Sequence, residues 1–349
     1  MNEQAKPTDF GRSQPPDEQW LARAIPEEAI EADLPIIDTH MHLFDRGPGN
    51  RYFIEEYARD LLASGHNVEA TVYVECNSMY RAQGPAVLKS VGEVEFAVGM
   101  AAMAASGKYT SCRVAAGIVA NADPLIGEAV AEVLDAHGNA GNGRLRGVRR
   151  RVRWDPDPAV RGAAAADRPG ILLEHAFHRG LREVARRDLV FEASVFHPQI
   201  PDVTALARAV PEASIVLLHT GSPVGHGSYA GHEAEVHSKW RAAMSELATC
   251  PNVTVKLGGL LMSLASFDFG IASRPPASEE LVQLWRPYIE PCVELFGAGR
   301  CMVASNFPVE KAGAGYGTIW NMFKRIFSGC SGEEKRSIFS GTASRIYRV

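Results

Sequence analysis

The chain has 349 residues, of which 46% are hydrophobic and 22% charged, and its formal net charge is −5. This composition excludes general disorder and supplies a sizeable core for one large domain or two ordinary ones. The small negative charge predicts no extended basic face, which argues against nucleic acid or an anionic membrane as a partner. We therefore expect a small-molecule substrate, and the sequence leaves homo-oligomer formation open.

The first 34 residues are rich in Pro, Asp and Glu and have no clear periodicity, so we interpret 1–34 as an N-terminal extension over the surface. The chain begins without the apolar stretch of a signal peptide and contains no run of about 18 apolar residues. We expect a cytoplasmic protein. The six cysteines form no C-x-x-C pair, which argues against a zinc knuckle or redox dithiol and predicts buried free thiols.

Short apolar runs alternate with longer amphipathic stretches from residue 35 onward. The apolar runs predict strands at 35–42, 70–76, 113–120, 145–152, 189–196, 214–220, 253–259 and 301–306. Helical periodicity appears between strands, as at 126–138, 175–187, 202–210 and 232–248. Since parallel strands need such crossovers, the series favours an α/β fold, a closed (β/α)8 TIM barrel over 35–349.

Two further amphipathic segments, 317–329 and 333–347, are expected to be C-terminal helices that complete the outer ring. An open Rossmann-like sheet is the alternative architecture. No G-x-G-x-x-G motif follows the first strand, however, so a dinucleotide site has no support.

Two histidines close the first predicted strand, in the segment IIDTHMHLFD. The alternation of side chains along a strand puts His40 and His42 on one face, directed into the mouth of the barrel at the carboxyl end of the strand. A buried structural role is the alternative for a single histidine. Burying two imidazoles without partners is costly, which favours a functional pair.

His197 and His219 follow the fifth and sixth predicted strands. Both are therefore expected at the rim where barrel enzymes carry their catalytic groups, and together with Asn306 they should share one pocket with the first pair. A turn contact beside Pro198 is the alternative for His197. The further histidines are interpreted as lid or surface residues: His226, His232 and His237.

Glu75 ends the second strand and is followed by Tyr80 and Arg81. A carboxylate there can bind substrate hydroxyls or act as a surrogate base, and a solvated loop acid is the alternative. Arg149 and Arg151 lie on one face of the fourth strand, and guanidinium groups suit bidentate recognition of a carboxylate or sulfonate. Ion pairing with loop acids is the alternative for these arginines.

The H-x-H of the first strand, the histidines after the fifth and sixth strands, and CMVASNFPVEK at the eighth strand resemble the amidohydrolase-related family (amidohydrolase family 2). The similar branch includes sugar-lactone and 2-pyrone-4,6-dicarboxylate lactonases. The resemblance extends from about residue 34 to 349 and includes LRGVRR, HTGSPVGHGSYAG, VKLGG and SGTASRIYRV. It implies a hydrolase of a small cyclic ester or lactone, with a carboxylated substrate as one option.

The resemblance also implies a metal site. In this superfamily the first-strand pair, the fifth-strand histidine and an eighth-strand aspartate usually bind the metal, although some lactonases of this branch work without one. It thus implies His40, His42 and His197 as ligands of a divalent metal, zinc or manganese. His219 would be a further ligand or the group that polarises the scissile carbonyl.

The chain departs from the superfamily at Asn306, where S-N-F-P replaces the usual S-D-W-P. A neutral amide cannot accept a proton from water, so the usual general base is absent. We expect Asn306 to orient the water and Glu75 or a histidine to activate it if no metal binds. The alternatives are decarboxylation or hydration of a small aromatic or dicarboxylic acid, and a binding protein without catalysis.

Overall fold

The protein is described by a computed structural model that covers residues 15–161, 168–264 and 272–349. Its main sheet contains eight parallel strands, and neighbouring strands are joined in the order β1, β4, β5, β6, β7, β8, β9 and β10. The strands are β1 (Ile36–Met41), β4 (Val68–Val74), β5 (Arg113–Asn121), β6 (Leu145–Arg151), β7 (Val190–Ser194), β8 (Ile215–Leu217), β9 (Val253–Leu257) and β10 (Cys301–Val303).

Hydrogen bonds across the seam close the sheet into a barrel. The backbone amide of Asn306 donates to the carbonyl of His40 over 2.9 Å. The backbone amide of His42 donates to the carbonyl of Phe307 over 2.8 Å. A hairpin of β2 (Phe44–Asp45) and β3 (Arg51–Tyr52) follows β1. The predicted (β/α)8 barrel is confirmed, and its strands are apolar because helices cover their outer faces.

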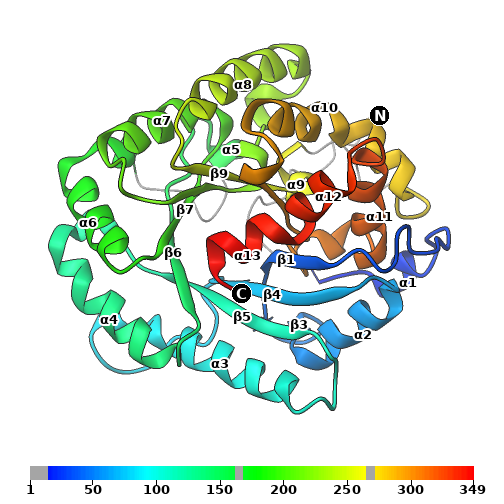
Figure 1. The fold of residues 1–349 in the computed structure, drawn as a ribbon, viewed down its shortest axis with the longest axis horizontal. Coiled ribbons are helices and arrows are strands. Elements are labelled where there is room, and N and C mark those ends of the chain that lie inside the picture. The colour runs from blue at the N-terminus through cyan, green and yellow to red at the C-terminus, as the bar shows by residue number, and fades with distance from the viewer. Residues whose placement is uncertain (1–14, 162–167, 265–271) are drawn as a thin grey trace.

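Helices surround the barrel in a ring (Figure 1). The helices of the described ranges are α1 (Glu18–Leu21), α2 (Ile54–Ser64), α3 (Val91–Ala105), α4 (Val130–Ala140), α5 (Pro158–Arg161), α6 (His175–Arg186), α7 (Ile200–Ala209), α8 (Glu233–Ala248), α9 (Leu260–Leu264), α10 (Ser278–Phe296), α11 (Tyr316–Ile326), α12 (Gly332–Arg336) and α13 (Thr342–Tyr347). The last helix, α13, is not part of this ring. Glycine ends some of these helices: α2 ends at Gly65, which has a left-handed φ of 67°.

The last predicted helix, 333–347, is not a single helix of the outer ring. It is divided into α12, a π-helical turn (Ser337–Gly341) and α13, and α13 lies in the middle of the ring of strands in Figure 1. Ala343 and Tyr347 of α13 are fully buried among inward-facing strand residues such as Val72 and Val216. The helix therefore closes the amino-terminal end of the barrel.

Residues 15–34 pack on the outside of the barrel. The indole of Trp20 donates to the carbonyl of Ala272 over 2.8 Å, and the amide of Ile30 donates to Asn321 over 2.9 Å. A domain boundary at residue 34 stays a prediction. All six cysteines are free thiols, and five of them are buried. No helix within the described ranges combines the length and the apolar character needed to span a membrane.

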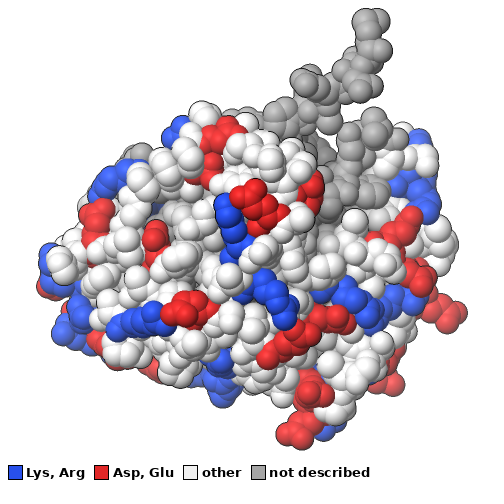
Figure 2. All heavy atoms as spheres, turned by 90° about the horizontal axis from the view of Figure 1, so that it is seen from above, with Lys and Arg blue, Asp and Glu red and all other residues white. Residues whose placement is uncertain are grey.

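Charged side chains of both signs are mixed on the face shown in Figure 2. The described surface also carries exposed ion pairs, such as Arg182 with Glu212, 3.2 Å apart. The barrel interior, by contrast, contains a fully buried ion pair. Lys256 of β9 lies 2.6 Å from Glu192 of β7, and neither side chain is exposed.

Further hydrogen bonds surround the buried pair. The ammonium of Lys256 also donates to the carbonyl of Thr39, and the hydroxyl of Tyr347 donates to Glu192 over 2.6 Å. Burial lowers the pKa of Lys256 to about 8, against the opposing attraction of Glu192. Removing one partner of such a pair leaves an uncompensated charge in a medium that solvates it poorly.

We predict that Lys256→Met lowers the free energy of unfolding by about 3 to 5 kcal/mol, the cost typical of breaking a buried ion pair. The double variant Glu192→Gln with Lys256→Met should recover a large part of this loss, because it leaves no buried charge. Urea unfolding followed by tryptophan fluorescence measures both effects. Equal stability of the single variant and the native chain would contradict the predicted role of the pair.

Candidate active site

Polar side chains gather where the strands end, at the rim opposite α13. His40 belongs to the end of β1 and His42 follows it directly, while His197, His219 and Asn306 lie two or three residues beyond β7, β8 and β10. Because the strands are parallel, these five residues belong to one rim of the barrel. His40 and His42 share a face because side chains alternate between the two faces of a strand and these residues are two positions apart.

His40, His42 and His219 form a histidine cluster. The ring centroids of His40 and His42 are 4.9 Å apart, and those of His40 and His219 are 4.6 Å apart. Burial is the main cause that lowers the pKa of all three, to about 3 for His42 and well below the ordinary value for the others, and nearby cations add to it. The three rings are therefore neutral imidazoles at neutral pH.

Hydrogen bonds define the protonated nitrogen in two of these rings. The Nδ1 of His42 lies 2.7 Å from the carbonyl oxygen of Val74, and because a carbonyl only accepts, Nδ1 carries the proton and Nε2 a lone pair. The Nε2 of His40 lies 3.4 Å from the guanidinium of Arg149, which only donates, so this nitrogen also carries a lone pair.

Arg149 reaches the histidine cluster from β6 and is held there by Glu75. Its Nε lies 2.7 Å from Oε1 of Glu75, and the exposed fractions of the two side chains are 4% and 0%. Arg149 also donates to the carbonyl of Glu75, and Arg151 lies 3.4 Å from the second carboxylate oxygen. The sequence left open an ion pair for these arginines and a solvated loop position for Glu75; the structure shows the ion pair and a fully buried Glu75.

The same contacts determine the charge of Glu75. Burial alone would raise its pKa, but Arg149 and Arg151 outweigh burial and lower the pKa to about 2. Glu75 is thus an anion near neutral pH, and both of its oxygens are paired with guanidinium groups. The sequence reasoning missed Arg153, although the period-two run RGVRRRVRW reaches it; burial first, then Arg149 and Arg151, lower its pKa to about 9.

A strained turn positions His219. His219 and Thr220 have φ values of 51° and 57°, in the left-handed region that β-branched residues such as Thr rarely adopt. Gly259, with a φ of 66°, faces the imidazole of His219, and a Cβ atom there would overlap the ring. The glycine pair in VKLGG, visible in the sequence, thus has a packing role that sequence reasoning did not assign.

We predict that Gly259→Ala displaces His219 and lowers kcat/KM by about 100-fold, the effect of a catalytic group misplaced by about 1 Å. Gly138→Ala in α4 is the matched control, because nothing lies within 4 Å of a Cβ at that position. Steady-state kinetics with circular dichroism as a fold check makes the comparison. Full activity in the Gly259 variant would remove His219 from the site.

His197 lies apart from the histidine cluster. Its ring centroid is 5.0 Å from that of Tyr229, and its Nδ1 accepts from the amide of Val224 over 3.4 Å. Burial lowers its pKa to about 4. It lines a cavity of about 170 Å3 with Tyr229, His232 and Lys239 among others. The ring contacts bring His40, His42 and His219 together, whereas the ring contact of His197 is with Tyr229. One pocket shared by all five predicted residues stays a prediction.

Asn306 contacts a carboxyl group that sequence reasoning missed. Its side-chain amide donates to Oε1 of Glu310 over 3.1 Å, and the amide of Leu261 donates to Oε2 over the same distance. Burial raises the pKa of Glu310 to about 7. The only signal in the sequence is the position of this acid, four residues after Asn306 in SNFPVEK.

The arrangement does not fit the metal site implied by the resemblance. Within the described ranges, no three His, Cys, Asp or Glu side chains are close enough together to hold a metal ion. Arg149, a cation, lies beside the Nε2 that His40 would offer, and His197 contacts Tyr229 instead. Zinc or manganese binding therefore stays a prediction, and no chemical step below depends on it.

We predict that Asn306→Asp strengthens divalent metal binding without abolishing activity. The new carboxylate would face Glu310, and a cation relieves the repulsion between two buried carboxylates. Calorimetric titration with zinc and with manganese compares this variant with the native chain and with Asn306→Ala, which adds no charge. If the Asp variant binds neither metal better and loses activity, Asn306 itself has a specialised catalytic role.

Tyr80 and Arg81, predicted to bind substrate, lie further out. The Tyr80 hydroxyl donates to Asn77 over 3.2 Å, and its side chain is partly exposed. Arg81 forms an exposed ion pair with Glu95 of α3. A substrate role for these two residues stays a prediction, because the contacts described for them involve Asn77 and Glu95 and not the histidine cluster.

An eight-stranded barrel with polar groups at its carboxyl rim is the architecture of a large class of enzymes. Comparison with known proteins identifies the family, since the amidohydrolase family matches residues 37–349. The chain belongs to this family and is a hydrolase-type enzyme, as the resemblance implied.

Individual relatives agree with this assignment. An uncharacterised protein, y4mH of Sinorhizobium fredii, is 30% identical over 91% of this chain and all of its own length. A Burkholderia multivorans protein named L-fucono-1,5-lactonase is 28% identical over 59% of this chain and 64% of its own length. A crystal structure of a Burkholderia multivorans amidohydrolase with bound zinc has a TM-score of 0.67, at 23% identity over 90% of this chain and 99% of that one.

Proposed function

We propose that the protein hydrolyses the ester bond of a small lactone that carries a carboxylate. The observation that carries the proposal is a cluster of three neutral imidazoles at the carboxyl rim, in which His40 contacts Arg149. Arg151 pairs with the same carboxylate, Glu75, as Arg149 does. Lactonase activity is supported by the relatives of Burkholderia multivorans and Burkholderia ambifaria that are named L-fucono-1,5-lactonases.

The arginines bind the anionic group of the substrate. Arg149 is engaged with Glu75 on two sides, whereas Arg151 has one contact of 3.4 Å and 18% of its side chain exposed, so its donors remain accessible to a ligand. Glu75 orients both guanidinium groups rather than taking a proton, because Arg149 and Arg151 occupy its two carboxylate oxygens. Because the histidines are neutral, the arginines supply the positive charge that binds the anion.

His219 polarises the lactone carbonyl. Its Nδ1 is buried and has no hydrogen-bond partner among the described residues. Because Nδ1 faces Gly259, the substrate oxygen is bound at Nε2, which carries the proton in this proposal. Charge that develops on the carbonyl oxygen during attack is stabilised by a fixed donor in a site that excludes water.

His42 activates the attacking water. Its Nε2 keeps a lone pair because Nδ1 is bonded to Val74. Arg149 contributes to the low pKa of His42 after burial, and a bound carboxylate offsets that repulsion. The water oxygen bonds to the carbonyl carbon, the ring C–O bond breaks, and the proton held by His42 passes to the departing ring oxygen. The product is an open-chain hydroxy acid.

A substrate panel tests the proposal. Carboxylated lactones, their neutral methyl esters and aromatic carboxylic acids are incubated with the native chain, and ring opening and carbon dioxide release are measured. We expect ring opening with a preference for the carboxylated lactones. Carbon dioxide release from the aromatic acids without any ring opening would replace the proposal by decarboxylation, and no turnover at all would favour a binding protein.

We predict that Arg151→Ala raises KM for the carboxylated lactone by an amount worth about 1.5 to 3 kcal/mol, the value of a charged hydrogen bond. The neutral ester should show little change, which makes it the internal control. Arg149→Ala should in addition destabilise the fold, because it leaves Glu75 buried without its main partner. Unchanged kinetics in the Arg151 variant would limit these arginines to an ion-pairing role.

We predict that His42→Gln lowers kcat by about 100-fold or more, the usual contribution of a general base, with a smaller change in KM. Glu310→Gln is the comparison, since the carboxyl of Glu310 has a pKa of about 7 and lies beside Asn306. Pre-steady-state kinetics and thermal unfolding are recorded for both. An intact fold with the larger loss in the Glu310 variant would transfer the role of base to Glu310.

A further inference from the structure

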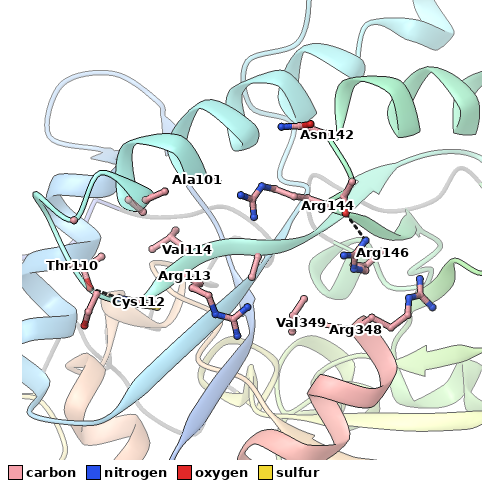
Figure 3. A pocket seen from close by; sticks show the side chains of 16 residues that line it. Ala101, Thr110, Cys112, Arg113, Val114, Asn142, Arg144, Arg146, Arg348 and Val349 are labelled. Carbon is pink, nitrogen blue, oxygen red and sulfur yellow. Dashed lines mark hydrogen bonds between the residues drawn. The ribbon is translucent and has the colours of Figure 1, made fainter.

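A second cavity lies at the amino-terminal end of the barrel, away from the histidine cluster. Its volume is about 670 Å3, within the range of small-molecule sites. It lies between the start of β5, the loop before β6 and the end of α13, and Figure 3 shows these three segments around it. Four arginines line it: Arg113, Arg144, Arg146 and Arg348.

Arginines outnumber acidic side chains around the cavity. No Asp or Glu is among its described lining residues. Within the described part of the chain, the side chains of Arg113 and Arg144 take part in no hydrogen bond or ion pair. Arg146 donates to the carbonyls of Gly143 and Leu145, and its buried Nε has no partner there. Arg348 alone has an acid partner, Asp188, at 2.8 Å.

Mutual repulsion among these arginines is visible at Arg146. Burial is the largest cause that lowers its pKa, and the charges of Arg348 and Arg144 lower it further. A guanidinium does not lose its proton at physiological pH, so the arginines of the cavity repel one another. An anion relieves it directly.

The floor of the cavity is tightly packed. A Cβ at Gly117 would lie 3.0 Å from Cγ1 of Val349 and 3.1 Å from Cγ of Arg146, so the glycine lets these side chains approach β5. The wall also offers neutral hydrogen-bonding groups from Thr110, Ser111 and Asn142. Such a mixture of guanidinium, hydroxyl and amide groups is suited to phosphate oxygens.

We propose that this cavity binds a small phosphorylated molecule that presents a diphosphate group. Arg113 and Arg144, whose side chains have no partner among the described residues, can each bind one phosphate of a diphosphate, and the volume leaves room for more than the diphosphate itself. The bound molecule links β5 and β6 to α13, the helix that closes this end of the barrel. The site is independent of the lactonase chemistry, because α13 and the barrel interior separate it from the carboxyl rim.

Calorimetric titration of the full chain with inorganic pyrophosphate and with ADP tests the proposal. The variant Arg113→Gln with Arg144→Gln should weaken binding by about tenfold or more, since each substitution removes a charged hydrogen bond. This variant should fold normally because neither side chain has a partner in the described part. The matched control is Arg241→Gln with Arg286→Gln, two exposed arginines of α8 and α10 that are paired with Glu294 and Glu290.

The outcomes separate the sources of the diphosphate. Tighter binding of ADP supports a nucleotide, and tighter binding of pyrophosphate supports the free ion. Hydrogen exchange should show slower exchange at 342–348 when the probe is bound. Absence of saturable binding by both probes, equal weakening in the two double variants, or protection only at the carboxyl rim would overturn the proposal.

Discussion

Arg149 and Glu75 form a buried ion pair in the mouth of the barrel, in which each charge replaces the water that would otherwise solvate the other. The arrangement of the other polar side chains at the rim depends on this pair. The pair holds a guanidinium against Nε2 of His40, where the superfamily pattern leads one to expect a metal. It also gives Glu75 a second oxygen with which to orient Arg151. Burial with this fixed cation keeps the neighbouring imidazoles neutral, so the site combines proton acceptors with an anion-binding group.

The two ends of the barrel are joined by a polar interior. Tyr347 of α13 bonds to Glu192, Glu192 pairs with Lys256, and Lys256 donates to the carbonyl of Thr39, the residue before His40. These contacts connect α13 to β1 through three fully buried side chains. The arginine cavity, built in part by the residues after Tyr347, lies at the outer end of this chain of contacts.

Sequence periodicity predicted which residues of one strand lie on the same face. Side-chain alternation predicted that His40 and His42 share one face of their strand and that Arg149 and Arg151 share one face of theirs. The positions of the strand ends predicted that both pairs lie at one rim. Contacts between distant elements could not be predicted this way, because they depend on which strands face each other across the interior. Lys256 in VTVKLGG is one such case, since its partner Glu192 lies on another strand.

Turns limited the prediction in the same way. His197 ends a strand as His219 does, but the turn after β7 directs it towards Tyr229. A crystal structure with a carboxylated lactam, the slowly hydrolysed counterpart of the lactone, tests the account most directly. We expect the carboxylate within hydrogen-bond distance of Arg151, the carbonyl oxygen at His219, and His42 beside the carbonyl carbon. A ligand bound elsewhere on the rim, or with its carboxylate away from both arginines, would contradict the account.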